Sequence, residues 1–255
     1  MIKSVIEFIS AVRNDLAVWH SSSEPIRPWF RGESGNDPPL RPRIAGYSKE
    51  KENYLLQSFR RKARGIANTP PRDETDLWLF FAQHYGVPTR LLDWTEGALL
   101  GLYFAVNQAN PNPRVYMLHP HKLNELTGAQ QSDGLNFPLT WLNRGYENIA
   151  LAWEERQITR GFDLPIAVPA TYLDHRMIAQ RSCFTVHGKK LDPLPELLRN
   201  RGVNVGDYLI EYHIDLDVTA QLKGELAILG VTGSTVFPDI DHLGSDISSE
   251  ILPGR

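Results

Sequence analysis

The sequence contains a single cysteine, Cys183, among its 255 residues. One thiol cannot form an intramolecular disulfide, and it disfavours a zinc site built from several cysteines. No apolar stretch approaches the roughly 18 residues that a membrane span needs. Glu7 also interrupts the N-terminal segment where a signal peptide requires an apolar run. We therefore expect a protein of the reducing cytoplasm that has no membrane partner.

Neither positive nor negative charge dominates the chain. The 27 Lys and Arg residues stand against 30 Asp and Glu, which gives a formal net charge of −3. The basic field typical of many nucleic-acid-binding proteins is therefore absent from the molecule as a whole, although a local patch is compatible with these numbers. Hydrophobic residues make up 42% of the chain and charged residues 22%, as in globular domains that bury a sizeable core.

The chain also lacks several motifs that mark common catalytic and metal sites. It has no glycine-rich phosphate loop, no Gly-x-Ser-x-Gly elbow and no His-x-x-x-His pair. The two aspartates and the histidine within residues 239–242 are too closely spaced for a helical set of metal ligands. Cys183 alternates with Phe184 in an apolar stretch typical of a buried strand. We predict no metal site and no cysteine nucleophile.

Hydrophobic periodicity predicts helices early in the chain and strands later. The predicted helices span residues 4–19, 49–67, 73–85, 97–109, a short segment near 146–157, and 216–229. The predicted strands span residues 28–32, 114–118, 181–187 and 208–214. Residues 230–234 are expected to form a loop before a further strand. Helices followed by strands favour an α+β fold over repeated β–α–β units.

Two short blocks contain the residues best suited to chemistry. The first, residues 29–33, places Arg31 beside Gly32 at the end of a short strand. The planar guanidinium suits a bidentate grip on a phosphate or carboxylate. The alternative interpretation is a structural arginine that pairs with a nearby acid such as Glu33.

The second block, residues 83–95, has at least seven hydrogen-bonding side chains between two apolar helices. Polar groups in such surroundings must find partners, because an unpaired buried group costs about 1–3 kcal/mol. The block is therefore either a structural network or a binding site. His84 lies at a predicted helix C-terminus, where the helix dipole favours its protonated form. Arg90 and Asp93 are spaced to pair within a helical turn.

These blocks resemble the FRG domain family, which is named for the triplet Phe30-Arg31-Gly32. The strongest likeness is the run Gln-His-Tyr-Gly-Val-Pro-Thr-Arg-Leu-Leu-Asp-Trp-Thr, at residues 83–95. Further blocks similar to that family lie at residues 39–42, 52–61, 102–105, 176–185 and 237–241. Ser182 and His242 depart from the family pattern, which tends to have glycine at both positions.

The resemblance implies a fold and an activity. The layout of the family resembles the ADP-ribosyltransferase superfamily, in which an arginine or histidine on the first strand grips NAD. It implies an α+β fold with an ADP-ribosyltransferase-like split β-sheet core and an N-terminal helical part. Residues 1–28 would be the N-terminal helix and linker, and residues 29–255 a single FRG domain. The implied function is an NAD-dependent ADP-ribosyltransferase-like enzyme with NAD as its substrate, acting as a bacterial toxin or anti-phage defence effector.

The resemblance also suggests site residues. Phosphates would be held by Arg31 and Arg90, with Tyr85 or Trp94 stacked on the nicotinamide. The catalytic residues expected on this basis are Arg31, Glu52, His84, Asp93 and Gln180. The residues expected to bind NAD are Arg31, Tyr85, Thr89, Arg90 and Trp94. The late catalytic glutamate of the superfamily has no obvious counterpart here, and Gln180 and Glu211 are the nearest late residues.

The identity of the acceptor and the presence of catalysis stay open at this stage. A protein or nucleic-acid acceptor would make the protein a transferase, whereas water would make it an NAD glycohydrolase. An antitoxin or chaperone is a further expected partner. The alternative is a non-catalytic module that binds a nucleotide or nucleic acid, for which a basic cluster on one helix is suited. That cluster comprises Arg60, Arg61, Lys62 and Arg64.

Overall fold

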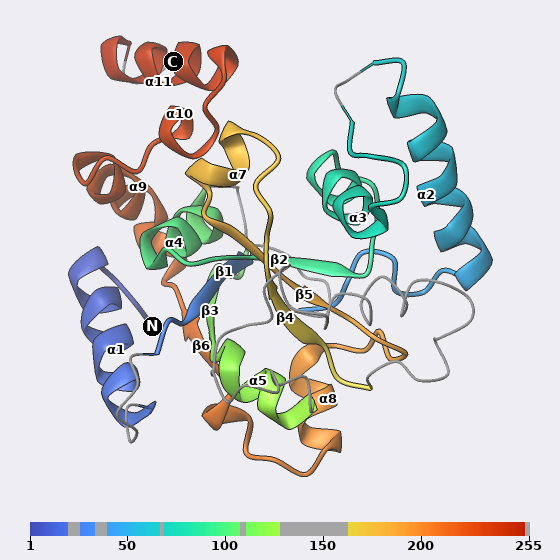
Figure 1. Cartoon of the computed structure of the whole chain (residues 1–255). Helices are drawn as coiled ribbons and strands as arrows, with labels where there is room; N and C mark the ends of the chain where they lie inside the picture. The colour runs from blue at the N-terminus through green and yellow to red at the C-terminus, as the bar shows by residue number, and fades with distance from the viewer. Residues whose placement is uncertain (20–25, 34–39, 67–68, 108–110, 128–162, 253–255) are drawn as a thin grey trace.

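The computed structural model of the chain describes residues 1–19, 26–33, 40–66, 69–107, 111–127 and 163–252 (Figure 1). Within these residues, an antiparallel sheet of six strands forms the centre of an α+β fold, in the order β4-β5-β2-β1-β3-β6. The strands are β1 (Trp29–Glu33), β2 (Leu91–Thr95), β3 (Arg114–Leu118), β4 (Ile166–Pro169), β5 (Ser182–Val186) and β6 (Leu209–His213).

The sheet is nearly divided at its middle. The register of β1 against β2 comprises one pair, Phe30 with Thr95. Each of the other neighbouring strand pairs is held by four or five residue pairs. The two halves, β4-β5-β2 and β1-β3-β6, therefore diverge beyond Phe30 and Thr95. This divergence leaves Arg31 and Asp93 at an opening between the two half-sheets.

Helices cover both faces of the sheet (Figure 1). The helices α1 (Val5–Trp19), α4 (Ala98–Val106) and α9 (Thr219–Ile228) pack with β1, β3 and β6 in one core cluster. On the opposite face, α5 (Pro120–Thr127) and α8 (Leu194–Asn200) cover a second cluster that includes Trp29, Trp94 and Tyr116. The 3₁₀ turns Val205–Asp207 and Leu216–Val218 flank β6.

A third layer is built on the β4-β5-β2 half of the sheet. Helix α3 (Thr75–His84) packs Phe80 on Phe184 of β5, with ring centroids 4.7 Å apart. Helix α2 (Lys49–Ala63) packs outside α3, so it lies at the edge of the molecule. The short helix α7 (His175–Ala179) directly precedes β5 in the chain. Helices α10 (Gly233–Val236) and α11 (Ile240–Ile251) follow α9.

Gly32 and Gly101 allow β1 and α4 to approach closely. A β-carbon on Gly32 would lie closer than 3.0 Å to the Gly101 carbonyl oxygen and to backbone atoms of Phe104 and Ala105. A β-carbon on Gly101 would lie 2.8 Å from the β-carbon of Phe30. The glycine of the Phe-Arg-Gly triplet is therefore required for packing, and it fixes the strand that carries Arg31.

The predicted α+β class and most of the predicted elements are confirmed. The prediction of a strand after residues 230–234 was wrong, because Thr232 caps helix α10 there with a reciprocal side-chain capping box. The prediction of a helical turn joining Arg90 and Asp93 was also wrong, because residues 91–95 form β2. The helix expected near 146–157 lies outside the described residues. Among the described helices, none is long and apolar enough to cross a membrane.

Candidate functional site

A pocket of about 370 Å³ opens where the two half-sheets diverge. Its walls come from β1, β2, β5, the C-terminal end of α3, α4 and α7. Four of the five residues expected to be catalytic line it: Arg31, His84, Asp93 and Gln180. The fold thus brings together residues that are up to 149 positions apart in the sequence.

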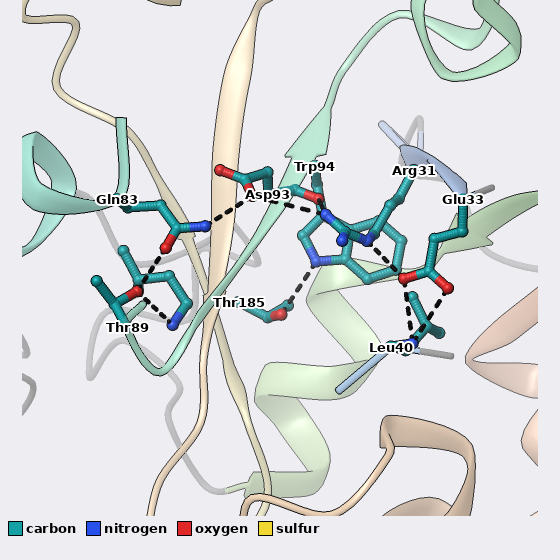
Figure 2. A network of polar contacts seen from close by, with 9 residues as sticks. Arg31, Glu33, Leu40, Gln83, Thr89, Asp93, Trp94 and Thr185 are labelled. Atoms are coloured by element: carbon teal, nitrogen blue, oxygen red, sulfur yellow. Dashed lines mark hydrogen bonds and ion pairs between the residues drawn. The ribbon is translucent and has the colours of Figure 1, made fainter. Parts of the chain in front are cut away.

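A chain of hydrogen bonds holds the carboxylate of Asp93 in this pocket (Figure 2). Thr89 Oγ accepts a hydrogen bond from the Leu91 amide (3.0 Å) and donates one to Gln83 Oε1 (2.6 Å). Gln83 Nε2 then donates to Asp93 Oδ2 at 2.7 Å. Thr89 was expected to bind NAD, but it is buried and does not line the pocket. It instead positions Gln83, which in turn holds Asp93. The Asp93 side chain itself is 56% exposed.

Arg31 is fixed between two acidic residues. Its Nε donates to Glu33 Oε1 at 2.8 Å, and its Nη1 donates to the Asp93 carbonyl oxygen at 2.8 Å. Glu33 in turn accepts from the Leu40 amide. Burial alone would lower the pKa of Arg31, but the charges of Glu33 and Asp93 outweigh it, so the pKa is raised. The structural ion pair with Glu33 therefore exists, and Arg31 also lines the pocket with a guanidinium whose orientation is set in advance.

His84 is the pocket's titratable base. Its Nε2 lies 2.7 Å from Asp174 Oδ2, while Asp174 Oδ1 caps α7 by accepting from the Met177 amide. Burial is the largest influence on His84 and lowers its pKa, whereas the nearby Asp174 charge acts in the opposite direction. The helix dipole at the end of α3 was expected to favour protonated His84, but burial outweighs it. A lowered pKa makes His84 neutral at physiological pH.

Two further arginines, Arg43 and Arg176, line the pocket and were not among the predicted site residues. Arg43 donates to the Gly86 carbonyl at 3.3 Å, and Arg176 lies over the ring of Phe237 at 4.7 Å. Neither forms an ion pair with any residue that the structure describes. Arg176 opens the third sequence block of the family resemblance, which was a usable signal, whereas nothing in its local sequence distinguished Arg43.

Glu52 and Arg90 lie outside the pocket. They form a buried bidentate ion pair, in which Arg90 Nε and Nη2 donate to the two Glu52 oxygens at 2.9 and 2.7 Å. Arg90 Nη1 donates to the carbonyl oxygens of His187 and Gly188. Because every guanidinium nitrogen is already bound, Arg90 is not placed to hold a phosphate. This pair instead joins α2 to the residue that directly precedes β2.

The two aromatic side chains expected to stack on nicotinamide are also placed elsewhere. Trp94 borders the pocket, but it alternates with Asp93 on β2, so its indole enters the core on the opposite face, where Nε1 donates to Thr185 at 3.0 Å. Tyr85 is 57% exposed and does not line the pocket. Phe104 of α4 lines the pocket with a partly buried ring, whereas Phe30 and Phe184, which also line it, are buried.

The last family-like block completes the wall beside α7. Phe237 packs on Phe104 and stacks on His242, with centroids 4.5 Å apart, while His242 contacts Asp239 at 2.8 Å. Gln180 donates to the Val236 carbonyl at 3.3 Å. These contacts hold Arg176 and Gln180 against the pocket. No group of three potential metal-binding side chains occurs among the described residues.

Comparison with known families matches residues 27–114 to the FRG domain. This match includes β1, α2, α3, β2 and α4, and residues 30–104 within it provide most of the pocket lining, although α2 contributes none of it. No curated protein and no solved structure matches the chain. The likeness to the FRG domain therefore concerns residues 27–114.

Proposed function

We propose that this chain, an FRG-domain protein by its match over residues 27–114, binds NAD in the pocket and breaks the nicotinamide–ribose bond. The activity would be that of an ADP-ribosyltransferase-like enzyme. The observation that carries the proposal is the composition of the pocket. Three guanidinium groups and one carboxylate, Asp93, face an opening between two half-sheets. A dianionic diphosphate joined to a sugar that gains positive charge matches that distribution.

The arginines provide the grip on the diphosphate. Arg43 and Arg176 lack acidic partners among the described residues, so their charge is available to a ligand. Arg31 uses Nε and Nη1 within the protein, which leaves Nη2 for a phosphate oxygen. Arginine forks bind phosphate in two-point contacts. This assignment replaces Arg90, whose nitrogens are all bound.

Asp93 is placed to stabilise the reacting sugar. When the nicotinamide–ribose bond breaks, the electron pair leaves with nicotinamide and positive charge develops on the ribose. Asp93 Oδ2 is held by Gln83, and among the described residues its Oδ1 has no hydrogen-bond donor, so that oxygen would be available to the bound sugar. A carboxylate fixed beside developing positive charge lowers the barrier, because it needs no reorganisation.

His84 is suited to activate the acceptor. With Nε2 held by Asp174, the neutral ring has a lone pair on Nδ1. The acceptor oxygen or nitrogen would bond to C1′ of the ribose as its proton passes to His84. The products are the ADP-ribosyl acceptor, nicotinamide and a proton, or ADP-ribose when the acceptor is water.

Nicotinamide release from NAD tests this function. Purified protein is incubated with NAD, with and without cell extract, and nicotinamide is measured by chromatography. Arg31→Ala and Asp93→Asn should each lower the rate at least 100-fold, the order expected for loss of one positioned charge. Arg199→Ala on α8 is a matched control because Arg199 is exposed and outside the pocket. Absence of turnover in every extract would count against the enzyme.

A second function has one observation in its favour. Among the described lining residues no glutamate occurs, so the late glutamate of the superfamily has no counterpart in this pocket. This favours a module that binds a nucleotide without cleaving it. Calorimetry that shows NAD and ADP-ribose binding equally, with no nicotinamide released, would support the module and contradict the enzyme.

A role as a bacterial toxin or defence effector follows if NAD is consumed in cells. Expression should then arrest growth and lower cellular NAD, and Arg31→Ala should relieve both effects. Growth arrest by the Arg31→Ala variant at equal protein levels would show that toxicity does not depend on the pocket.

A further inference from the structure

One segment of this acidic chain carries a marked excess of basic residues. Residues 40–72 contain nine Lys and Arg against two acids, Glu50 and Glu52. The rest of the chain has 18 Lys and Arg against 28 Asp and Glu. Glu52 is moreover buried with Arg90, so it does not offset the exposed cations. The segment is a local positive surface on a molecule of net charge −3.

The cations of α2 lie on its outer face. Lys51, Arg61 and Lys62 are exposed, as is the C-cap Arg64, whose guanidinium lies 5.9 Å from the ring centroid of Trp78, whereas Leu56 is buried and Ala63 is buried against α3. Figure 1 shows α2 along the outer edge of the molecule. None of these four cations forms an ion pair with a described residue. Burial, followed by the like charges of Arg64 and Arg72, also lowers the pKa of the neighbouring Arg60.

Helix stability alone does not explain this arrangement. The helix dipole favours cations in the last turn, which accounts for Arg60, Arg61 and Lys62. The same dipole disfavours cations in the first turn, yet Lys49 and Lys51 lie there. A distributed anion would favour positive charge along the full length of the helix.

Exposed aromatic side chains alternate with these cations. Tyr54 is 72% exposed on α2, and Tyr47, just before the helix, is 56% exposed with Lys51 Nζ 5.8 Å from its ring centroid. Exposed rings between cations are platforms on which unpaired bases stack, while the cations contact phosphates. An acidic protein would satisfy the charges but would not need the rings.

We infer that this face, formed by Arg43, Tyr47, Lys51, Tyr54, Arg61 and Lys62, binds single-stranded nucleic acid. Arg43 is exposed, lines the pocket and precedes Tyr47 by four residues, so on this proposal the strand passes from this face to the proposed NAD site past Arg43. The nucleic acid is then the acceptor. One of its nucleophilic oxygens or nitrogens bonds to C1′ of the ribose, nicotinamide leaves with the electron pair, and the acceptor proton passes to His84. The acceptor role rests on the proposed function, whereas strand binding does not.

Fluorescence anisotropy with a labelled 20-nucleotide single strand, without NAD, tests the binding. The triple variant Lys51→Gln, Arg61→Gln, Lys62→Gln should bind at least tenfold more weakly and reduce the slope of log affinity against log salt by about 2. Tyr54→Ala should weaken binding about fivefold or more through loss of stacking. The matched control, Arg13→Gln, Arg199→Gln, Arg201→Gln, removes three exposed cations elsewhere and should bind as the wild type does.

The outcomes separate the alternatives. Absence of salt-dependent binding by the wild type overturns the inference, as does equal weakening in the control triple variant. A labelled polyglutamate peptide that binds as tightly as the oligonucleotide would instead identify an acidic protein as the partner. Transfer of label from adenylate-labelled NAD to the strand supports the acceptor role. Strand binding with nicotinamide release but no labelled strand overturns that role, while Arg31→Ala should lose turnover and keep strand binding.

Discussion

Gly32 follows Arg31 on β1 and lies against the backbone of α4. Gly32→Ala should therefore destabilise the fold by about 3 kcal/mol or more, the upper end of overpacking costs, because the obstructing atoms are backbone. The urea midpoint measures this change. Gly224→Ala is the matched control, since Gly224 lies in α9 with open space around it. That control should be neutral or slightly stabilising. Equal stability of Gly32→Ala and wild type would contradict the close packing.

Substitutions of Glu52 and Asp93 should distinguish a residue that stabilises the fold from one that acts in the pocket. Glu52→Gln breaks a buried ion pair and should lower the free energy of unfolding by about 3–5 kcal/mol. Asp93→Asn alters a 56% exposed carboxylate and should lower nicotinamide release with little change in stability. Urea unfolding and turnover, measured on both variants, check the pair of expectations. The reverse pattern would place catalysis at Glu52.

His187 gives the fold a defined pH dependence. Burial lowers its pKa to about 3, and the nearby Arg90 charge acts in the same direction. An unfolded histidine titrates near 6.5, so the stability is fully present above pH 6.5 and falls as the pH decreases toward 3. At pH 5 this loss is about 2 kcal/mol. In the His187→Leu variant, this contribution should be missing from the difference in unfolding free energy between pH 7 and pH 5, as measured by urea unfolding. An unchanged difference would show that His187 does not cause it.

The assignment of individual residues was limited by what spacing along the chain can show. Arg90 lies three positions from Asp93, but its partner is Glu52, which is 38 positions away. Trp94 is adjacent to Asp93, yet strand alternation directs its indole to the opposite face. Arg43 becomes a pocket residue only because its loop packs beside Gly86. Long-range packing, and not local pattern, decides these three cases.

At the scale of elements, sequence patterns identified the helices and strands that have a clear hydrophobic periodicity. The first four helices bury apolar stripes and were predicted, as were β1, β3, β5 and β6. The strands β2 and β4 were not predicted, because β2 lies in the polar block 83–95, where a helical turn was expected, and β4 is only four residues long. The order of strands and the opening beside Phe30 and Thr95 depend on pairing between distant segments, which a single sequence does not reveal.

Helix α7 offers a test at the same scale. Asp174 caps the helix through Oδ1 and holds His84 through Oδ2, so one carboxylate orients both His84 and the helix that carries Arg176. Asp174→Ala should cost about 1 kcal/mol of stability from the lost cap. It should also raise the KM for NAD, because Arg176 loses its fixed position. Steady-state kinetics and urea unfolding measure the two effects, and an unchanged KM would contradict this positioning.

At the scale of the whole molecule, the pocket and the basic face of α2 meet at Arg43. Composition showed only a balanced, slightly acidic chain, and the resemblance implied an NAD site without its residues in space. The structure joins four of the expected catalytic residues with Arg43, Arg176 and Gln83 around one opening. The central claim is that these arginines hold the diphosphate of NAD.

Isothermal titration calorimetry with NAD tests that claim most directly. The double variant Arg43→Gln, Arg176→Gln is compared with wild type and with Arg199→Gln, Arg201→Gln, which removes two exposed cations that do not line the pocket. We predict that wild type and control bind NAD alike and that the double variant binds at least tenfold more weakly. Equal binding by all three proteins, or no binding by the wild type, would contradict the account.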